Sequence, residues 1–328
     1  MWVGLFLLLF VCCWEKFLFS LSVICIELVT PLGVHVGFGG ADDVEVVKRI
    51  VQKVEELGFD GVFVSEGLGD QPLDPFGLLS LASTFTERIA LGVVDYSLTL
   101  RHPIVTAKSV SSLQRLSDGR VVLGVDFSQS ESKGSPTYSG VMGALESECL
   151  ELVKKAWREE TLHYQGKFFK VEGMKVSSQL PENMNPHVWV EGRTPLAVLA
   201  AVHHASGLVP KNISPEEAES LTAHVKNTLK QESRRTAFVF GVRLPLILAA
   251  SEHRAQVLAA YYSKKLGESL ESFKSYSLVG DAAKITERLT SYFESGVNYA
   301  LLSTTHLENL EAQLEALAAL SRDVVPSL

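Results

Sequence analysis

The chain has 328 residues, of which 46% are hydrophobic and 21% charged, and its formal net charge is −8. This composition is typical of a globular protein, and the length allows one large domain or two small ones. Because the acidic chain has no cluster of Lys and Arg to neutralise phosphates, we predict no nucleic-acid binding. Only Cys149 of the four cysteines follows residue 28, so the main body has no internal disulfide and no cysteine-based metal site. We predict no metal site.

Residues 1–28 are far more apolar than the rest of the chain. A secretory signal needs a basic start and a small-residue cleavage site, and neither is visible. A membrane-spanning helix fits the length, but Glu15 and Lys16 would lie near its middle. The third interpretation is a misassigned start, with the natural chain beginning at Val29. We therefore separate an apolar leader, residues 1–28, from one domain over residues 29–328. The protein is expected to be cytoplasmic, or membrane-anchored if the leader is genuine.

Short apolar runs alternate with amphipathic helical patterns along the main body. In residues 54–66 a helix ends near Leu57, Gly58 suits the left-handed position after it, and residues 62–64 form a buried strand. We expect eight such strands, at residues 32–38, 62–65, 89–94, 121–125, 187–190, 207–209, 238–242 and 299–302. Their alternation with helices predicts a parallel α/β fold. Eight units favour a (β/α)8 TIM barrel, and a doubly wound open sheet is the alternative.

Two segments interrupt the alternation. Residues 162–171 predict a small inserted hairpin, because Gly166 and Lys167 lie between Tyr164 and Phe168. Residues 126–143 are rich in Ser and Gly and have no periodicity. We interpret them as a long loop that precedes a helix over residues 145–159. Both segments are expected to lie near the substrate.

Nine short motifs occur in one order between residues 32 and 302, beginning with Glu-Leu-Gly-Phe-Asp-Gly-Val-Phe-Val-Ser-Glu. They cover residues 56–66, 86–92, 101–103, 116–120, 123–125, 163–169, 188–192, 279–281 and 295–297. In these motifs the chain resembles the bacterial luciferase-like monooxygenase superfamily, including its methylenetetrahydromethanopterin reductase-like branch. The resemblance implies an oxidoreductase that uses FMN or the deazaflavin coenzyme F420 for hydride transfer or monooxygenation of a small organic substrate. It also implies a homodimer as one arrangement, since family members commonly pair through barrel helices.

The resemblance places the cofactor across the carboxyl ends of the strands. It implies that Glu191, Gly192, Arg193 and Thr194 hold the cofactor phosphate, and a helix start beside an arginine is a physically reasonable anion site. The alternative is a turn and helix cap with a solvated Arg193. Family members often have small residues in a bulge behind the cofactor ring.

That bulge position is occupied here by Val93, Val94 and Asp95, of which Val94 and Asp95 are predicted to contact the cofactor. Two consecutive β-branched residues favour a regular strand over a bulge. Asp126, after the fourth strand, would repel a phosphate if it pointed inward. These departures leave a second hypothesis open, a degenerate barrel that acts as a non-catalytic binding or structural protein.

Glu66 and His35 are the predicted catalytic residues. Glu66 ends the second strand at the edge of the barrel that carries chemistry. Many family members have a histidine after this acid, and histidine transfers protons near neutral pH; here Gly67 follows. His35, on the first strand, is either a substitute acid or base at the barrel mouth or a buried core residue.

Overall fold

The computed structural model describes residues 32–38, 43–66, 73–127, 136–234, 237–307 and 309–328, and for residues 136–140 the backbone alone. The predicted leader, residues 1–28, lies outside these ranges. Among the described residues no helix is both long and apolar enough to cross a membrane.

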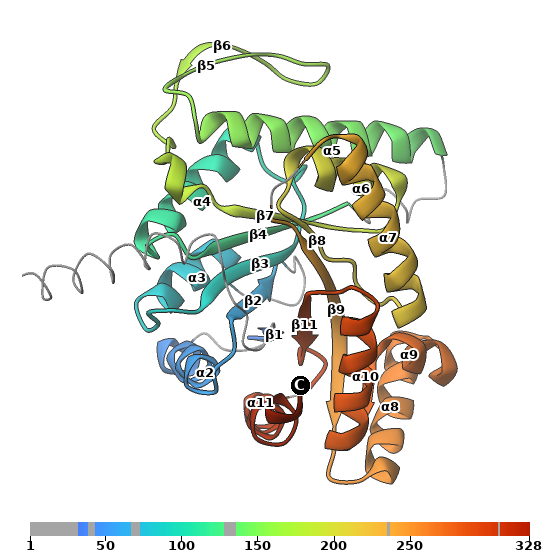
Figure 1. Ribbon diagram of the computed structural model, residues 1–328. Helices are drawn as coiled ribbons and strands as arrows, with labels where there is room; N and C mark the ends of the chain where they lie inside the picture. The colour runs from blue at the N-terminus through green and yellow to red at the C-terminus, as the bar shows by residue number, and fades with distance from the viewer. Residues whose placement is uncertain (1–31, 39–42, 67–72, 128–135, 235–236, 308) are drawn as a thin grey trace, which may run out of the picture. The chain divides into compact units, whose positions relative to one another are not determined.

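Within the described residues, parallel strands close into a barrel (Figure 1). Its eight strands are β1 (Leu32–His35), β2 (Gly61–Ser65), β3 (Ala90–Tyr96), β4 (Val121–Asp126), β7 (His187–Glu191), β8 (Gly207–Leu208), β9 (Val239–Leu248) and β11 (Tyr299–Ser303). The ring closes because β8 pairs with both β7 and β9, and β11 pairs with both β9 and β1. The prediction of a TIM barrel is confirmed.

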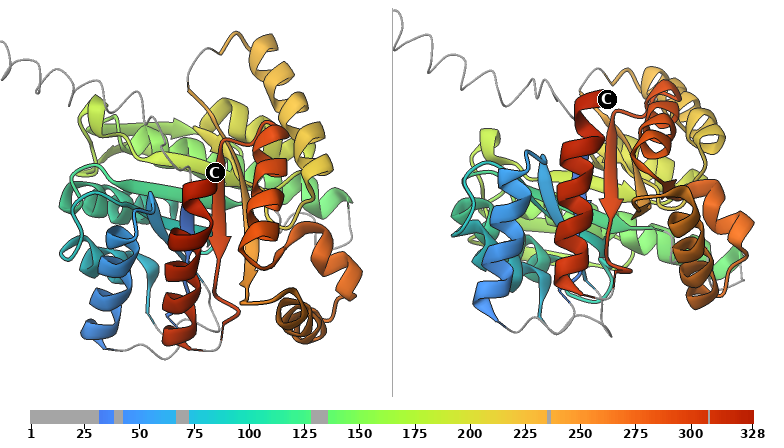
Figure 2. Two further views of the ribbon diagram at one scale, coloured as in Figure 1. Left: turned by 60° about the horizontal axis from the view of Figure 1, so that its bottom comes forward. Right: turned by 90° about the horizontal axis from the view of Figure 1, so that it is seen from below.

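Helices cover the outside of the barrel. They are α2 (Val44–Glu56), α3 (Pro75–Ser83), α4 (Pro103–Leu116), α5 (Pro136–Ala156), α6 (Pro195–His204), α7 (Pro215–Gln231), α8 (Glu252–Leu266), α9 (Leu270–Tyr276), α10 (Ala282–Glu294) and α11 (Leu310–Asp323). Short 3-10 turns lie at Glu182–Met184 and Val325–Ser327. The first of these helices, α2, contacts the last, α11 (Figure 2), so the layer of helices closes around the strands as well.

Several helices start in the same way at the carboxyl end of the barrel. A side chain caps the first turn and proline follows it, a position where its missing N–H costs nothing. The caps are Asp74 for α3, His102 for α4, Thr194 for α6 and Ser214 for α7. Ser214 also forms a capping box with Glu217. The strand-to-helix connections at this end are therefore fixed by local hydrogen bonds.

Two details of the predicted elements are wrong. Helix α5 begins at Pro136, so residues 136–143 are helical and not part of a loop; residues 128–135 lie outside the described residues. Strand β9 continues to Leu248, and its last residues pair with an unpredicted strand, β10 (Leu278–Gly280). A strand of three residues is too short to show an alternation that sequence patterns can detect.

The inserted hairpin is confirmed as strands β5 (Thr161–Gln165) and β6 (Lys170–Lys175), which pair antiparallel. Its turn is held by Glu148 of α5, whose carboxylate accepts hydrogen bonds from the backbone N–H groups of Lys167, Phe168 and Phe169 at 2.7–3.1 Å. Gly166 is required beside this carboxylate, because a Cβ atom there would lie 2.1 Å from Glu148 Oε1.

Three aromatic rings fill the interior of the barrel below its carboxyl end. The ring of Trp189 lies 5.3 Å from that of Phe63 and 5.0 Å from that of Tyr299, measured between centroids. Gly33 and Gly92 on the neighbouring strands leave room for these rings. A Cβ atom on Gly92 would lie 2.0 Å from Phe63, and one on Gly33 would lie 2.3 Å from the Tyr299 hydroxyl. The three rings therefore close the interior of the barrel beneath its carboxyl end.

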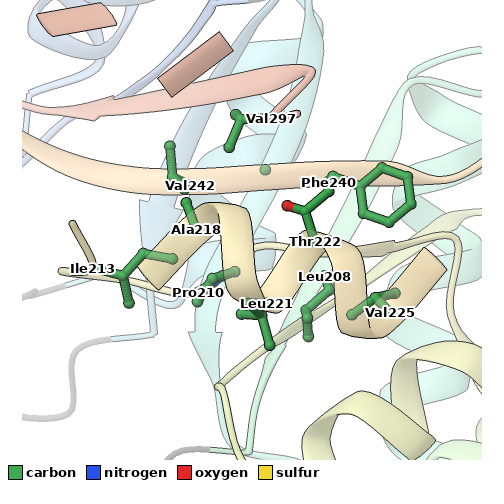
Figure 3. A pocket seen from close by; sticks show the side chains of 11 residues that line it. Leu208, Pro210, Ile213, Ala218, Leu221, Thr222, Val225, Phe240, Val242 and Val297 are labelled. Carbon is green, nitrogen blue, oxygen red and sulfur yellow. The ribbon is translucent and has the colours of Figure 1, made fainter. Parts of the chain in front are cut away.

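A narrow apolar gap lies between α7 and strands β8 and β9, lined by side chains such as Leu221 and Phe240 (Figure 3). It leaves about 10 Å³ for the centre of a water molecule. Since one water needs about that much space, the gap has room for about one water molecule and is too small for a substrate.

Candidate active site

Polar and charged side chains gather at the carboxyl end of the barrel, above the aromatic layer. They come from seven strands and from the segment after β8, and are joined to one another by hydrogen bonds and ion pairs. This mouth cluster consists of His35, Ser65, Asp95, Asp126, Glu191, Lys211, Arg243 and Ser303. In TIM barrels this end is where catalytic side chains lie.

Asp95 is at the centre of the mouth cluster. Its carboxylate accepts two hydrogen bonds from Arg243, at 2.8 and 2.6 Å, and one from Lys211 Nζ at 2.8 Å. Burial works to raise the pKa of Asp95, but the charges of Arg243 and Lys211 outweigh it and hold this pKa well below its usual range. Asp95 is therefore an anion that can only accept hydrogen bonds.

Asp95 also lies in a bulge, and the prediction of a regular strand at Val93 and Val94 is wrong. The pairing of β3 with β4 shifts register between Val93 and Tyr96, and Asp95 has a left-handed φ of 54°. This conformation is unfavourable for most residues. It is stabilised here because Glu191 Oε1 accepts from the Asp95 backbone N–H at 2.8 Å. Tertiary contacts thus override the β-branched preference of Val93 and Val94.

The remaining carboxylates of the cluster are deeply buried. Glu191 lies 3.1 Å from Arg243, and Asp126 lies 3.7 Å from Lys211. Burial raises the pKa of Glu191 to about 7, although the charge of Arg243 opposes the shift. Three acids thus share two cations, and Glu191 gains a proton more readily than Asp95.

Glu146 on α5 extends the buried acidity toward Asp126. Burial, and then the negative charge of Asp126, raise its pKa to about 8. An acid whose pKa is raised on folding stabilises the fold below its unfolded pKa, and this stability is lost as pH rises through the folded value. Between pH 5 and pH 9 the wild type should therefore lose roughly 3–5 kcal/mol more unfolding free energy than Glu146→Gln, which has no titrating group at this position.

Urea unfolding at the two pH values measures this difference. Glu182→Gln, an exposed acid in a 3-10 turn, is the matched control and should change in parallel with the wild type. If Glu146→Gln also changes in parallel, Glu146 does not titrate between these pH values.

His35 is buried beneath the cluster, with 5% of its surface exposed. Both ring nitrogens contact hydroxyl groups, Nε2 that of Ser65 at 2.8 Å and Nδ1 that of Ser303 at 3.1 Å. Burial, and then the positive charge of Arg243, lower its pKa to about 3. His35 is therefore a neutral member of a hydrogen-bonded chain.

Glu66 lies in a second, smaller cluster beside the mouth. Its Oε2 accepts from the backbone N–H of Ser97 at 2.8 Å, and its Oε1 lies 3.2 Å from Arg101. Arg101 also pairs with Asp74 at 2.7 Å and lies over the ring of Tyr96. Burial raises the pKa of Glu66. The structure thus holds Glu66 between β3 and the start of α4.

The structure separates the residues predicted at the cofactor phosphate. Glu191 faces the barrel interior, as its contact with Arg243 shows, whereas Thr194 caps α6 and Arg193 pairs with Glu217 at 3.2 Å in solvent. Gly192 has a left-handed φ of 141°, and a Cβ atom there would lie 3.0 Å from Ala197. An open groove of about 510 Å³ runs beside Arg193, with Glu216 and Glu217 in its wall.

Val94, also predicted to contact the cofactor, is 2% exposed; a Cβ atom on Gly124 would lie 3.3 Å from its side chain. Val94 therefore supports the bulge from within the wall, next to Asp95.

Sequence reasoning missed the two cations of the mouth cluster, Lys211 and Arg243. Arg243 was detectable, because it is a single charge within the otherwise apolar run of β9. A charge inside a buried strand needs a partner. Lys211 gave a weaker signal, its position shortly after β8.

A closed (β/α)8 barrel with buried charges at the carboxyl ends of its strands is the architecture of TIM-barrel enzymes. The family model described as luciferase-like monooxygenase matches residues 26–299. The chain belongs to this family, which confirms the predicted membership and the prediction of an oxidoreductase enzyme.

Two characterised relatives span most of the chain. An F420-dependent glucose-6-phosphate dehydrogenase of Intrasporangium calvum is 25% identical over 87% of this chain and 94% of its own length. A dimethyl-sulfide monooxygenase of Hyphomicrobium sulfonivorans is 24% identical over 82% of this chain and 66% of its own length. The F420-dependent tetrahydromethanopterin reductase of Methanopyrus kandleri shares the fold, with a TM-score of 0.72 at 15% identity over 90% of this chain and 98% of that one.

Proposed function

We propose that this chain is an oxidoreductase that uses FMN or coenzyme F420 for hydride transfer or monooxygenation of a small organic substrate. The observation that carries this proposal is the mouth cluster, which brings three acids and two cations together at the carboxyl end of the barrel. One relative is named as an F420-dependent dehydrogenase and the other as a monooxygenase. The proposal therefore includes both hydride transfer and monooxygenation.

The exposed part of the mouth cluster fits one edge of a flavin or deazaflavin ring. The side chains of Lys211 and Asp95 are 33% and 28% exposed, whereas those of Arg243 and Glu191 are 7% and 2% exposed. An ammonium and a carboxylate side by side offer donors and an acceptor to the carbonyl and imide groups along that edge. Lys211 and Asp95 are therefore the residues that would hold the ring.

The start of α6 is the proposed site of the cofactor phosphate. Thr194 and Gly192 form its turn, and Arg193 would exchange its exposed pair with Glu217 for the phosphate. Because exposed ion pairs contribute at most about 1 kcal/mol, breaking the pair between Arg193 and Glu217 costs little free energy.

When bound, the cofactor supplies the hydride or activates oxygen; the protein supplies position and protons. Lys211 is the cation that reaches the mouth, and its ammonium can donate a proton to a substrate oxygen that becomes negative. Asp95 and Asp126 keep Lys211 protonated by raising its pKa against the effect of burial. In this proposal Glu66 and His35 act from beside and beneath the ring.

The test is a fluorescence titration of the full-length protein with FMN and, separately, with F420. We expect saturable binding of one of them, weakened at least about tenfold in Lys211→Met because a charged hydrogen bond is lost. Lys53→Met, an exposed lysine of α2 that pairs with Glu56, is the matched control and should bind as the wild type does. Absence of saturable binding by protein with native far-UV circular dichroism would contradict the proposal.

We also propose that a leader over residues 1–28 precedes a barrel over residues 29–328, that two copies of the chain pair as a homodimer, and that the protein is cytoplasmic.

A further inference from the structure

A continuous row of hydrogen bonds links the protein surface to the mouth cluster beneath the proposed ring site. It runs from the exposed Thr305 hydroxyl to Ser303 (3.1 Å), to His35 Nδ1 (3.1 Å), from His35 Nε2 to Ser65 (2.8 Å), and to Asp95 Oδ2 (3.0 Å). Asp95 Oδ1 then contacts Lys211 Nζ at 2.8 Å. Every neighbouring pair is within hydrogen-bond distance.

The ionised Asp95 gives this row a single direction. Because its carboxylate only accepts, the Ser65 hydroxyl must donate to it, and Ser65 then accepts from His35 Nε2–H. A neutral imidazole that donates from Nε2 must accept at Nδ1, so Ser303 donates to His35. Ser303 has no second proton and therefore accepts from Thr305. All four hydrogen bonds point from the surface to Asp95.

We propose that Thr305, Ser303, His35, Ser65 and Asp95 form a proton path that recharges Lys211 from solvent after it has given a proton to the substrate. The role rests on the proposed function, but the direction of the path does not. Lys211 loses one proton to the substrate, and the loss of its charge removes one of the causes that keep Asp95 ionised. Asp95 then takes a proton from Ser65 on Oδ2, turns its carboxyl group, and gives that proton to Lys211 Nζ. Each group along the row passes a proton on and takes one from the group before it, and water supplies Thr305. The net change is one proton moved from water to substrate.

The path assigns His35 a role that differs from that of an acid at the mouth. At rest it is a neutral ring in the Nε2–H tautomer that positions the Ser65 hydroxyl against Asp95. Each proton that passes leaves the ring in the Nδ1–H tautomer, and the ring and the hydroxyl groups reorient before the next proton passes. It does not touch the substrate.

The ring ¹⁵N chemical shifts of His35 in the full-length, cofactor-free protein test the direction, with the signal assigned by its loss in His35→Gln. We expect a neutral ring with its proton on Nε2 at neutral pH. In Ser65→Ala the acceptor at Nε2 is lost while the ion pairs of Asp95 stay, so the proton should move to Nδ1 and be donated to Ser303. A wild-type Nδ1–H tautomer, or an unchanged tautomer in Ser65→Ala, would overturn the proposal.

Exchange of the His35 Nε2 proton with water tests conduction. His35 is nearly inaccessible, so exchange that uses the path should slow at least tenfold in Ser303→Ala, which breaks the row on the solvent side. Ser327→Ala, far along the chain in the C-terminal 3-10 turn, is the control. Equal exchange in Ser303→Ala and wild type would show that protons reach His35 by another route. Neither measurement uses the cofactor, so failure of cofactor binding is distinguishable from failure of the path.

Discussion

Replacing Arg243 with methionine is expected to lower the free energy of unfolding by about 3–5 kcal/mol, the largest loss we predict for a single ion-pair residue. Arg243 is buried, and its guanidinium contacts the carboxylates of both Asp95 and Glu191. Methionine has a similar length but no charge. It would leave Asp95 with Lys211 as its only cation in the cluster and Glu191 with none, and an unpaired buried charge is costly.

Urea unfolding at pH 7 measures this effect. Arg49→Met is the matched control, because Arg49 also forms an ion pair, with Glu311 at 2.8 Å, but half of its side chain is exposed. That change should cost at most about 1 kcal/mol. Without Arg243 the pKa of Glu191 should rise above its wild-type value of about 7, so Glu191 can stay protonated near neutral pH. The cost of Arg243→Met should therefore be smallest at and below pH 7 and increase as the pH rises above 7. Equal losses for the two arginine variants would show that the mouth cluster does not stabilise the barrel.

Replacing Gly92 with alanine is expected to lower the free energy of unfolding by about 3 kcal/mol through overpacking. The added Cβ atom would lie 2.0 Å from the ring of Phe63, and that ring cannot withdraw because it stacks on Trp189. Either the ring leaves its rotamer or β2 and β3 separate.

The control for this variant is Gly77→Ala on helix α3, where a Cβ atom would meet nothing within 4 Å. That change should raise the unfolding free energy by about 0.5–1 kcal/mol, the helix propensity of alanine over glycine. Adding Phe63→Leu to Gly92→Ala should recover part of the loss if the ring is the obstacle. Urea unfolding of the four proteins provides the comparison, and a neutral Gly92→Ala would mean that the aromatic layer is loosely packed.

The barrel was predictable because its signals are local. A strand such as β2 shows itself by three successive apolar residues, and α7 by Ser214, Pro215 and Glu217 at its start. Each signal lies within a few residues, and repetition of the pattern fixes the fold class. Strand β8 was found despite its two residues because it occupies the expected place between two helices.

The mouth cluster was only partly predictable because its contacts are remote in sequence. His35 and Ser303 are 268 positions apart, and Asp95 and Arg243 are 148 positions apart. Positions on strands identified His35 and Glu66 as candidates, and the family resemblance identified Asp95 and Glu191. Neither signal shows which partner a side chain meets. The expectation of a regular strand at Val93 and Val94 is wrong for the same reason, since the contacts that stabilise the bulge at Asp95 come from β7 and β9.

Strand β8 makes the barrel wall thinnest on one side. Only Gly207 and Leu208 pair with β7 and β9, and beyond them the wall continues through a single bridge between Lys211 and Arg243. Both of these side chains bind Asp95 on β3, so their ion pairs tie the thin side to a distant strand. Whatever draws Lys211 away from Asp95 therefore also releases a restraint on local opening of the barrel. Binding of a molecule at the mouth cluster and local opening of the barrel wall at β8 are therefore coupled through the carboxylate of Asp95.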